Sequence, residues 1–128
     1  MAYIGLVTLV VRDYDEAIDF YVQAVGFHLA EDKRLDDGKR WVVVCPPGAI
    51  ETGLLLARAA TPAQRERIGD QTGGRVCLFL HTGDFWRDYR RMRAAGVSFP
   101  QRPRLEPYGW IAVFEDLYGN RWDLLQPA

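Results

Sequence analysis

The chain has 128 residues, of which 48% are hydrophobic and 26% charged, a composition typical of one folded domain and not of a disordered segment. Sixteen basic and seventeen acidic side chains leave a formal net charge of −1, so no positive field is present to attract nucleic acid. The apolar run at residues 3–11 is far shorter than the ~20 residues of a membrane span and lacks the features of a signal peptide. We therefore expect neither a nucleic-acid partner nor a membrane partner.

Two cysteines, Cys45 and Cys77, lie in separate apolar runs of the sequence. Two cysteines do not make a disulfide framework, and this low content indicates reduced thiols and a cytoplasmic location. A single bridge between them is the alternative, if the fold brings the two side chains together.

The first half of the chain predicts one strand, one helix and three further strands. Val, Ile and Leu dominate residues 3–11, which favours a buried strand. Asp13 then supplies an N-cap, Glu16 completes a capping box three residues later, and Gly26 ends the helix. The three strands that follow are expected at residues 27–33, 40–45 and 52–58.

The second half repeats this order of elements after a polar connector at residues 59–74. Within the connector, Thr61 is a good N-cap and Pro62 suits the first helical position, which predicts a short surface helix. Asp84 then caps a second long helix that Gly96 ends. The strands of this half are expected at residues 75–82, 97–101, 110–115 and 121–126.

Two motifs at opposite ends of the chain carry a family resemblance. Residues 9–27 read LVVRDYDEAIDFYVQAVGF, and residues 115–125 read EDLYGNRWDLL. With the repeat between them, these motifs resemble the vicinal oxygen chelate superfamily. That superfamily includes glyoxalase I, fosfomycin-resistance proteins, extradiol dioxygenases and bleomycin-resistance proteins, and the resemblance covers nearly the whole chain.

The resemblance implies an α+β fold in which two paired βαβββ modules form an open U-shaped mixed sheet around a cleft. Residues 1–128 would then be a single glyoxalase/bleomycin-resistance-like domain. Module one would span about residues 1–58, the connector residues 59–74, and module two about residues 75–128. The resemblance also implies a homodimer that completes the cleft.

Metal-dependent members of the superfamily hold a divalent ion with four ligands, mostly His and Glu, from the first and last strand of each module. In this chain three of those positions fall at Leu6, Cys77 and Asp123, and the fourth falls within residues 52–58, which contain no His, Asp or Glu. Leucine cannot bind a metal, and a lone buried cysteine is more often a small core residue. We therefore expect no resident metal, with a divalent ion held weakly by Asp123 and His81 as the alternative.

Strand alternation extends the set of residues that would face the cleft. If Leu6 faces the cleft, so does Thr8, and if Cys77 faces it, so do Phe79 and His81. An imidazole can bind a metal, act as a general base or hydrogen-bond a ligand. The alternative for His81 is a partly exposed polar residue at a strand end.

The tryptophans add candidates for an apolar ligand pocket. Trp41 and Trp110 fall in corresponding strands of the two modules, with core packing as the alternative for both. Trp122 precedes Asp123 on an alternating strand and is expected in the core. The predicted ligand-binding set is His81, Asp123, Cys77, Phe79, Leu6, Thr8, Trp41 and Trp110.

These residues favour a glyoxalase/bleomycin-resistance-like protein with a degraded metal site that binds a small apolar or aromatic molecule in a dimer cleft. Two enzymatic alternatives stay open. One is a metal-dependent lyase, isomerase or dioxygenase with a non-standard ligand set. The other is a cofactor-free enzyme in which His81 and Asp123 carry out acid–base chemistry.

Overall fold

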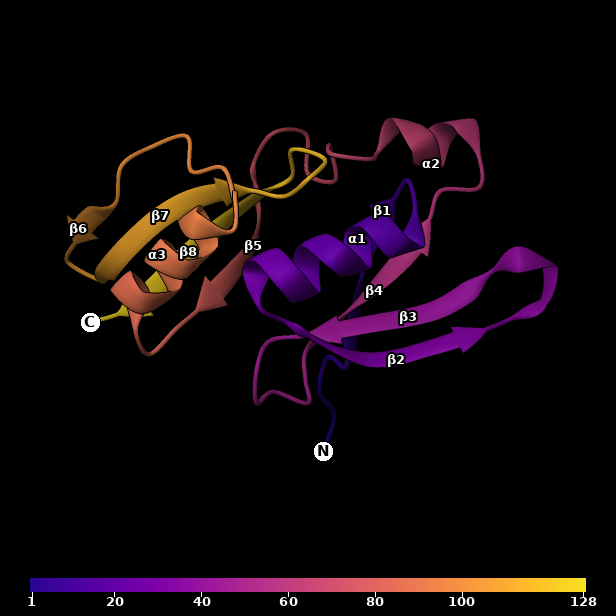
Figure 1. Ribbon diagram of the computed structural model, residues 1–128, viewed down its shortest axis with the longest axis horizontal. Coiled ribbons are helices and arrows are strands. Elements are labelled where there is room, and N and C mark those ends of the chain that lie inside the picture. Colours follow the sequence, from indigo (N-terminus) through magenta and orange to yellow (C-terminus); the bar gives the residue numbers. More distant parts are fainter. The chain divides into compact units, whose positions relative to one another are not determined.

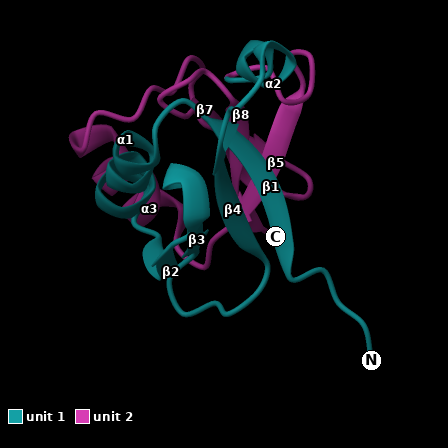
Figure 2. Ribbon diagram, turned by 90° about the vertical axis from the view of Figure 1, so that its right-hand side faces the viewer, with its two compact units in different colours: residues 1–68 teal, residues 69–128 magenta.

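The computed structural model describes residues 1–128, which divide into two compact units at residues 1–68 and 69–128 (Figure 2). The boundary between the units falls inside the connector expected at residues 59–74. Each unit contains one four-stranded sheet with both parallel and antiparallel neighbours, which confirms the predicted α+β class (Figure 1). None of the helices has both the length and the apolar character that crossing a membrane requires.

Unit one follows the predicted order of strand, helix and three strands. Its sheet has the order β1-β4-β3-β2, in which β1 and β4 are parallel and the other neighbours antiparallel. Its elements are β1 (Leu6–Val11), α1 (Tyr14–Asp19), the π-helical η1 (Phe20–Val25), β2 (His28–Arg34), the 3₁₀ turn η2 (Asp36–Gly38), β3 (Arg40–Cys45), β4 (Gly53–Arg58) and α2 (Pro62–Glu66).

The first helix begins and ends at the residues that the sequence predicts. A carboxylate oxygen of Asp13 accepts a hydrogen bond from the backbone N–H of Glu16 at 3.0 Å, which satisfies one of the donors left open at a helix N-terminus. Gly26 has a φ of 93°, the left-handed conformation that ends helices and that glycine adopts without steric cost. Local sequence signals therefore determine this helix.

The register of β1 with β4 separates the two faces of the first sheet. Val11 pairs with Arg58, and the guanidinium of Arg58 lies 5.1 Å from the ring centre of Tyr14 on α1, so this face is the one that α1 covers. Leu9 lies two residues earlier on the same face and is buried. Leu6 and Thr8 lie on the opposite face and are exposed, so this open face of the first sheet is only partly covered by its own unit.

Unit two repeats the arrangement of strands with a single helix. Its sheet has the order β5-β8-β7-β6, and β5 and β8 are its parallel pair. Its elements are β5 (Val76–His81), α3 (Phe85–Ala94), β6 (Arg104–Glu106), β7 (Gly109–Glu115) and β8 (Arg121–Pro127).

The strand predicted at residues 97–101 is wrong. Only Ser98 makes a bridge there, through its carbonyl, which accepts the backbone N–H of Glu115 at 2.9 Å. Pro100 and Pro103 lack the N–H that a strand ladder needs, and they keep this segment out of the sheet. The edge strand forms instead at β6, directly after the second proline.

Aromatic side chains fill the core of unit two. Phe114 is fully buried and stacks on Trp122, with ring centres 5.6 Å apart. This contact confirms the expectation that Trp122 is a core residue. Phe85, at the first position of α3, is also fully buried and anchors the helix to the sheet.

Candidate functional site

The face of the second sheet that α3 leaves uncovered carries the most distinctive polar group of the chain. Residues that pair across neighbouring strands share a face, and the register pairs Asp123 with Phe79 on one side and with Val113 on the other. We call this surface the Asp123 face. By register and alternation it includes Phe79, His81, Arg104, Ile111, Val113, Glu115, Arg121, Asp123 and Leu125.

The carboxyl group of Asp123 is poorly compensated. The residue is buried, with 8% of its surface exposed, and its Oδ1 accepts no hydrogen bond. Burial raises the pKa of this carboxyl above its usual value, and the positive charge of Arg104 opposes that rise. A buried oxygen without a donor costs free energy, and any group that brings a donor to it would remove that cost.

Apolar side chains surround this carboxyl. Phe79 pairs with it in register and leaves 60% of its surface exposed, which is unusual for a large aromatic side chain on a sheet. Ile111 and Val113 lie on the same face of β7. Apolar walls around a few polar groups are typical of small-molecule sites.

Two other candidates on β5 differ in their surroundings. His81 ends the strand, is exposed, and pairs with Leu125 on the Asp123 face. Cys77 is partly buried at an irregularity of the ladder between Val76 and Leu78. Burial and the nearby carboxylate of Asp116 raise the pKa of the Cys77 thiol, which does not favour the nucleophilic thiolate. Cys77 and Cys45 are both free cysteines.

The two tryptophan candidates lie on different sides of their sheets. Trp41 is on the open face of the first sheet, and its Nε1 donates a hydrogen bond to Glu31 Oε2 at 3.0 Å. Trp110 instead lies against α3, with its ring centre 5.0 Å from that of Trp86 and 6.0 Å from that of Phe85. Trp110 therefore belongs to an aromatic cluster on the helix side, away from the Asp123 face.

The donor set of the chain does not fit a resident divalent metal. No group of three or more His, Cys, Asp or Glu side chains lies close enough together to hold an ion. Leu6 offers a hydrocarbon at the first family ligand position, and β4 contains no metal-binding side chain. A transition-metal site needs three or four donors, so we derive no chemistry through a metal.

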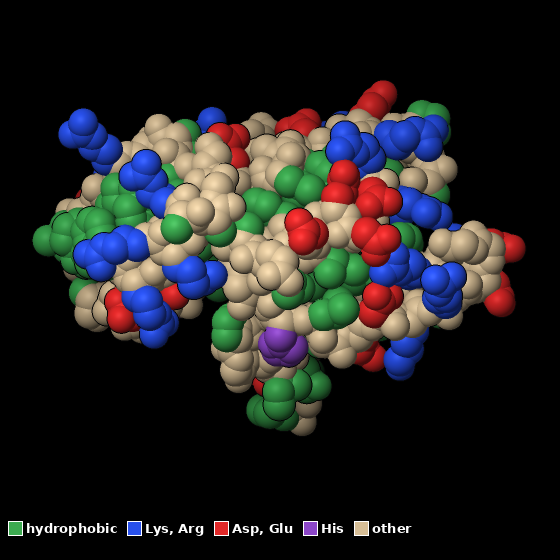
Figure 3. Space-filling model, viewed as in Figure 1, with side chains coloured by type: hydrophobic (Ala, Val, Ile, Leu, Met, Phe, Trp, Pro, Cys, Tyr) green, Lys and Arg blue, Asp and Glu red, His purple; other side chains and the backbone are tan.

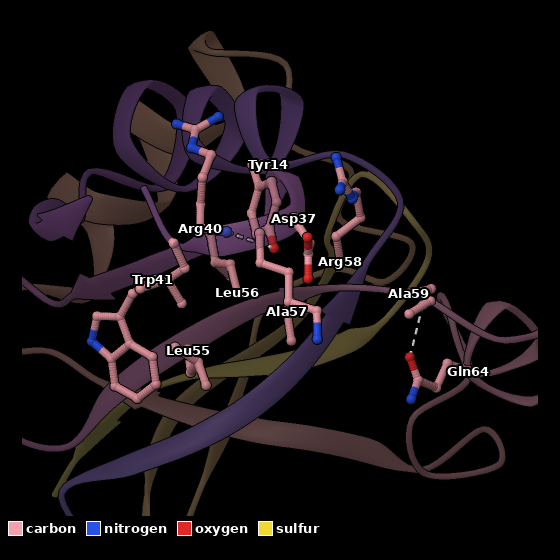
Figure 4. Close-up of a pocket in the computed structure, with 13 residues that line it drawn as sticks. Tyr14, Asp37, Arg40, Trp41, Leu55, Leu56, Ala57, Arg58, Ala59 and Gln64 are labelled. Atoms are coloured by element: carbon pink, nitrogen blue, oxygen red, sulfur yellow. Dashed lines mark hydrogen bonds between the residues drawn. The ribbon is translucent and has the colours of Figure 1, made fainter. Parts of the chain in front are cut away.

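Unit one contains a pocket that the sequence analysis missed (Figure 4). Its volume is about 390 Å³, and it lies where β3 begins and β4 ends. These strands pair only through Val43 with Leu55 and Val44 with Leu54. Outside these two pairs, β3 is paired only with β2 and β4 only with β1, and the two strands separate (Figure 1). No local sequence signal marks such a separation.

Comparison with known proteins gives a family match over almost the whole chain. The family described as the Glyoxalase/Bleomycin resistance protein/Dioxygenase superfamily matches residues 3–124. A protein of Shewanella frigidimarina, described only as uncharacterized, is 60% identical over 121 residues, which are 94% of this chain and 90% of that protein. The uncharacterized protein YurT of Bacillus subtilis is 32% identical over 128 residues, covering 96% of this chain and 98% of YurT.

Two crystal structures have the same fold at more than 30% sequence identity. UcmS2 superimposes with a TM-score of 0.85 at 31% identity, with 98% of each chain covered. TnmS3 of Streptomyces sp. CB03234, described as an antibiotic binding protein, superimposes with a TM-score of 0.80 at 34% identity. That match covers all of this chain and 98% of TnmS3.

Proposed function

Since the chain belongs to the Glyoxalase/Bleomycin resistance protein/Dioxygenase superfamily, we propose that it binds a small apolar or aromatic molecule that carries a hydrogen-bond donor. Membership in this superfamily identifies the fold and not the chemistry, because one scaffold hosts different sites. The proposal therefore depends on the residues of the Asp123 face. The observation that carries it is the buried Oδ1 of Asp123, which accepts no hydrogen bond.

A ligand donor would remove the main energetic cost of this site. In the free protein the carboxyl has lost much of its hydration and gained no donor in return, which is why its pKa is raised. An O–H or N–H group of a ligand that reaches Oδ1 would supply the missing hydrogen bond. Hydrogen bonds to charged groups contribute about 1.5–3 kcal/mol, so this contact selects ligands that have a donor.

The aromatic character of the ligand follows from the neighbouring side chains. Phe79 offers an exposed ring beside the carboxyl, and the half-buried Val113 lies on the other side of the carboxyl on β7. An aromatic ligand that stacks on Phe79 would bury apolar area of both partners, at about 25 cal/mol per Å². TnmS3, which has the same fold, is described as an antibiotic binding protein, and this supports small-molecule binding as the role of the present chain.

A matched pair of probes tests the proposal. 2-Naphthol carries one O–H donor, whereas 2-methoxynaphthalene has the same rings without that donor. Calorimetric titration should show wild-type protein binding 2-naphthol about tenfold more tightly, which corresponds to about 1.4 kcal/mol. In Asp123→Leu the preference should disappear, and in Phe79→Ala both probes should bind more weakly.

The exposed Asp19 supplies a control for the loss of one carboxylate, since Asp19→Leu should bind both probes as wild type does. Equal affinity of wild-type protein for the two probes would refute the proposal. An unchanged preference in Asp123→Leu would also refute it, because the donor would then meet another group.

A further inference from the structure

The pocket of unit one has a different chemistry from the Asp123 face. The residues that line it include the apolar Leu35, Leu55, Leu56 and Ala57, with Trp41 at its edge. Its volume of about 390 Å³ is in the range of small-molecule sites. All of its lining residues belong to unit one, so the pocket is complete within that unit.

The opening of this pocket comes from the separation of two strands. β3 and β4 pair through Val43 and Val44 but not where β3 begins and β4 ends, so no strand pairing closes the space there. Trp41 lies at the edge of the pocket, where its Nε1–H donates to Glu31 and orients the indole. A planar apolar group can therefore enter between the two strands.

Two arginines flank Tyr14 in the pocket, but only one of them is neutralised (Figure 4). Arg40 makes ion pairs of 2.8 Å with both Asp15 and Asp32. The space-filling view shows basic and acidic side chains interspersed at this end of unit one (Figure 3). The charge of Arg40 is therefore already compensated.

Arg58 is oriented without a carboxylate partner. Its guanidinium lies 5.1 Å from the ring centre of Tyr14, and its Nη2 donates a 3.2 Å hydrogen bond to the carbonyl of Gly38. These contacts hold the planar group while its other N–H donors remain for a ligand. Lys39 adds a second cation to the lining, and Asp37 is the single acidic residue there.

Tyr14 adds a neutral donor at the same place. Its hydroxyl oxygen accepts the backbone N–H of Arg40 at 3.2 Å, so the position of the hydroxyl is fixed and its own proton can point to a ligand. A guanidinium fork binds a carboxylate with two parallel hydrogen bonds, an arrangement that a lysine cannot reproduce.

We propose that this pocket is a second ligand site that binds small aromatic carboxylates. The ring of the ligand would lie against the leucines, and its carboxylate would meet the guanidinium of Arg58, with Lys39 and the hydroxyl of Tyr14 nearby. This site is separate from the Asp123 face, where the buried carboxyl of Asp123 repels an anionic ligand.

An isosteric pair of probes isolates the role of charge. 2-Naphthoate carries the carboxylate, and 2-naphthamide has the same rings and nearly the same shape without the charge. Calorimetric titration of the wild-type protein should give about tenfold tighter binding of 2-naphthoate, since a charge-assisted bidentate pair replaces neutral hydrogen bonds. Arg58→Gln should reduce this preference to about one, and Arg58→Lys should restore only part of it because the fork is lost.

Controls separate this site from general charge effects and from the function proposed above. Arg102→Gln removes one exposed cation from a loop of unit two and should leave the preference unchanged. Asp123→Leu should leave it unchanged as well, so failure at one site does not imply failure at the other. Thermal unfolding of Arg58→Gln verifies that the variant is folded.

Three results would overturn the proposal. One is the absence of 2-naphthoate binding by the wild-type protein, and another is equal affinity for the two probes. The third is a preference that survives in Arg58→Gln, because the carboxylate would then meet a different cation.

Discussion

Phe79 and Asp123 occupy paired positions on the parallel strands β5 and β8, so their side chains lie next to each other on one face of the second sheet. Their exposures are the reverse of what their polarities favour, at 60% for the aromatic residue and 8% for the acid. Neither arrangement stabilises the isolated fold. This pair is the basis of the ligand site proposed above, and Asp123 is the subject of the first prediction.

Replacing Asp123 with asparagine should change how stability depends on pH. Burial raises the pKa of the folded-state carboxyl, so the folded protein holds this proton more tightly than the unfolded chain does. The stability that the protonated carboxyl contributes to the fold is therefore fully present below the ordinary Asp pKa of about 3.9. This stability is lost as pH rises through the folded-state pKa. An asparagine side chain does not titrate, so Asp123→Asn should gain stability relative to wild type across that interval.

Urea unfolding at a series of pH values measures this difference. The control is Asp19→Asn, which makes the same replacement at an exposed carboxylate of α1. If the free energy of unfolding of Asp123→Asn falls relative to that of wild type as pH rises, the assigned direction of the pKa shift is wrong.

The turn between β7 and β8 should depend on a buried hydrogen-bond network. Asp116 Oδ1 accepts the backbone N–H groups of Tyr118 and Asn120 at 2.9 Å each, and Asp116 Oδ2 accepts Nδ2 of Asn120 at 2.9 Å. Asp116→Ala removes the acceptor of two backbone donors and should lower the free energy of unfolding by about 3 kcal/mol. Asn120→Ala removes one donor and should cost about 1–2 kcal/mol.

Leu117→Ala, in the same turn but 37% exposed, should cost less than about 1 kcal/mol in the same denaturation series. Equal losses for the three variants would show that the network does not stabilise the turn.

Gly109 should tolerate a side chain less well than another glycine with a positive φ. Its φ is 137°, and a Cβ there would collide with the backbone carbonyl of Gln126 on β8. Gly48 has a φ of 75° with open space around the Cβ position. Gly109→Ala should therefore lose about 3 kcal/mol or more, whereas Gly48→Ala should lose about 1 kcal/mol from backbone strain alone.

Thermal and urea unfolding measure the free energy of unfolding of both glycine variants. The difference between them separates the cost of the steric clash at position 109 from the cost of backbone strain alone. Similar losses would mean that the β7 and β8 ends adjust without cost, contrary to the rigid pairing of Gly109 with Pro127.

We expect the chain to form a homodimer. Leu6 and Phe79 leave 39% and 60% of their surfaces exposed on the open faces of the two sheets, and β1 and β5 are sheet edges. A second copy would cover such surfaces and edges. Sedimentation at micromolar concentration should give twice the 14.6 kDa mass of one chain, and a species of 14.6 kDa would contradict this expectation.

Local signals in the sequence were sufficient for much of the fold. The caps at Asp13 and Asp84 and the left-handed glycines Gly26 and Gly96 each depend on residues within one helical turn, and all four have the predicted role. Strand alternation likewise separated the exposed Thr8 from the buried Leu9. Such features need no knowledge of distant residues.

Features that depend on pairing between distant segments were harder to predict. The edge strand β6 forms at Arg104–Glu106 because it pairs with β7. Prolines before it keep residues 97–101, the segment predicted as a strand, out of the sheet. Trp110 turned toward α3 because of the register between β7 and β8, which composition does not reveal. The pocket beside Arg58 arises where two strands separate, and its residues come from separate segments between Tyr14 and Gln64.

The most direct test of ligand binding at Asp123 is the titration of its own carboxyl group, followed by the ¹³C chemical shift of Cγ with and without saturating 2-naphthol. A donor that hydrogen-bonds the ionised carboxyl stabilises the charged form and lowers its pKa. The account predicts that 2-naphthol shifts the Asp123 titration to lower pH, whereas 2-methoxynaphthalene does not. A titration that 2-naphthol leaves unchanged would contradict the proposed site.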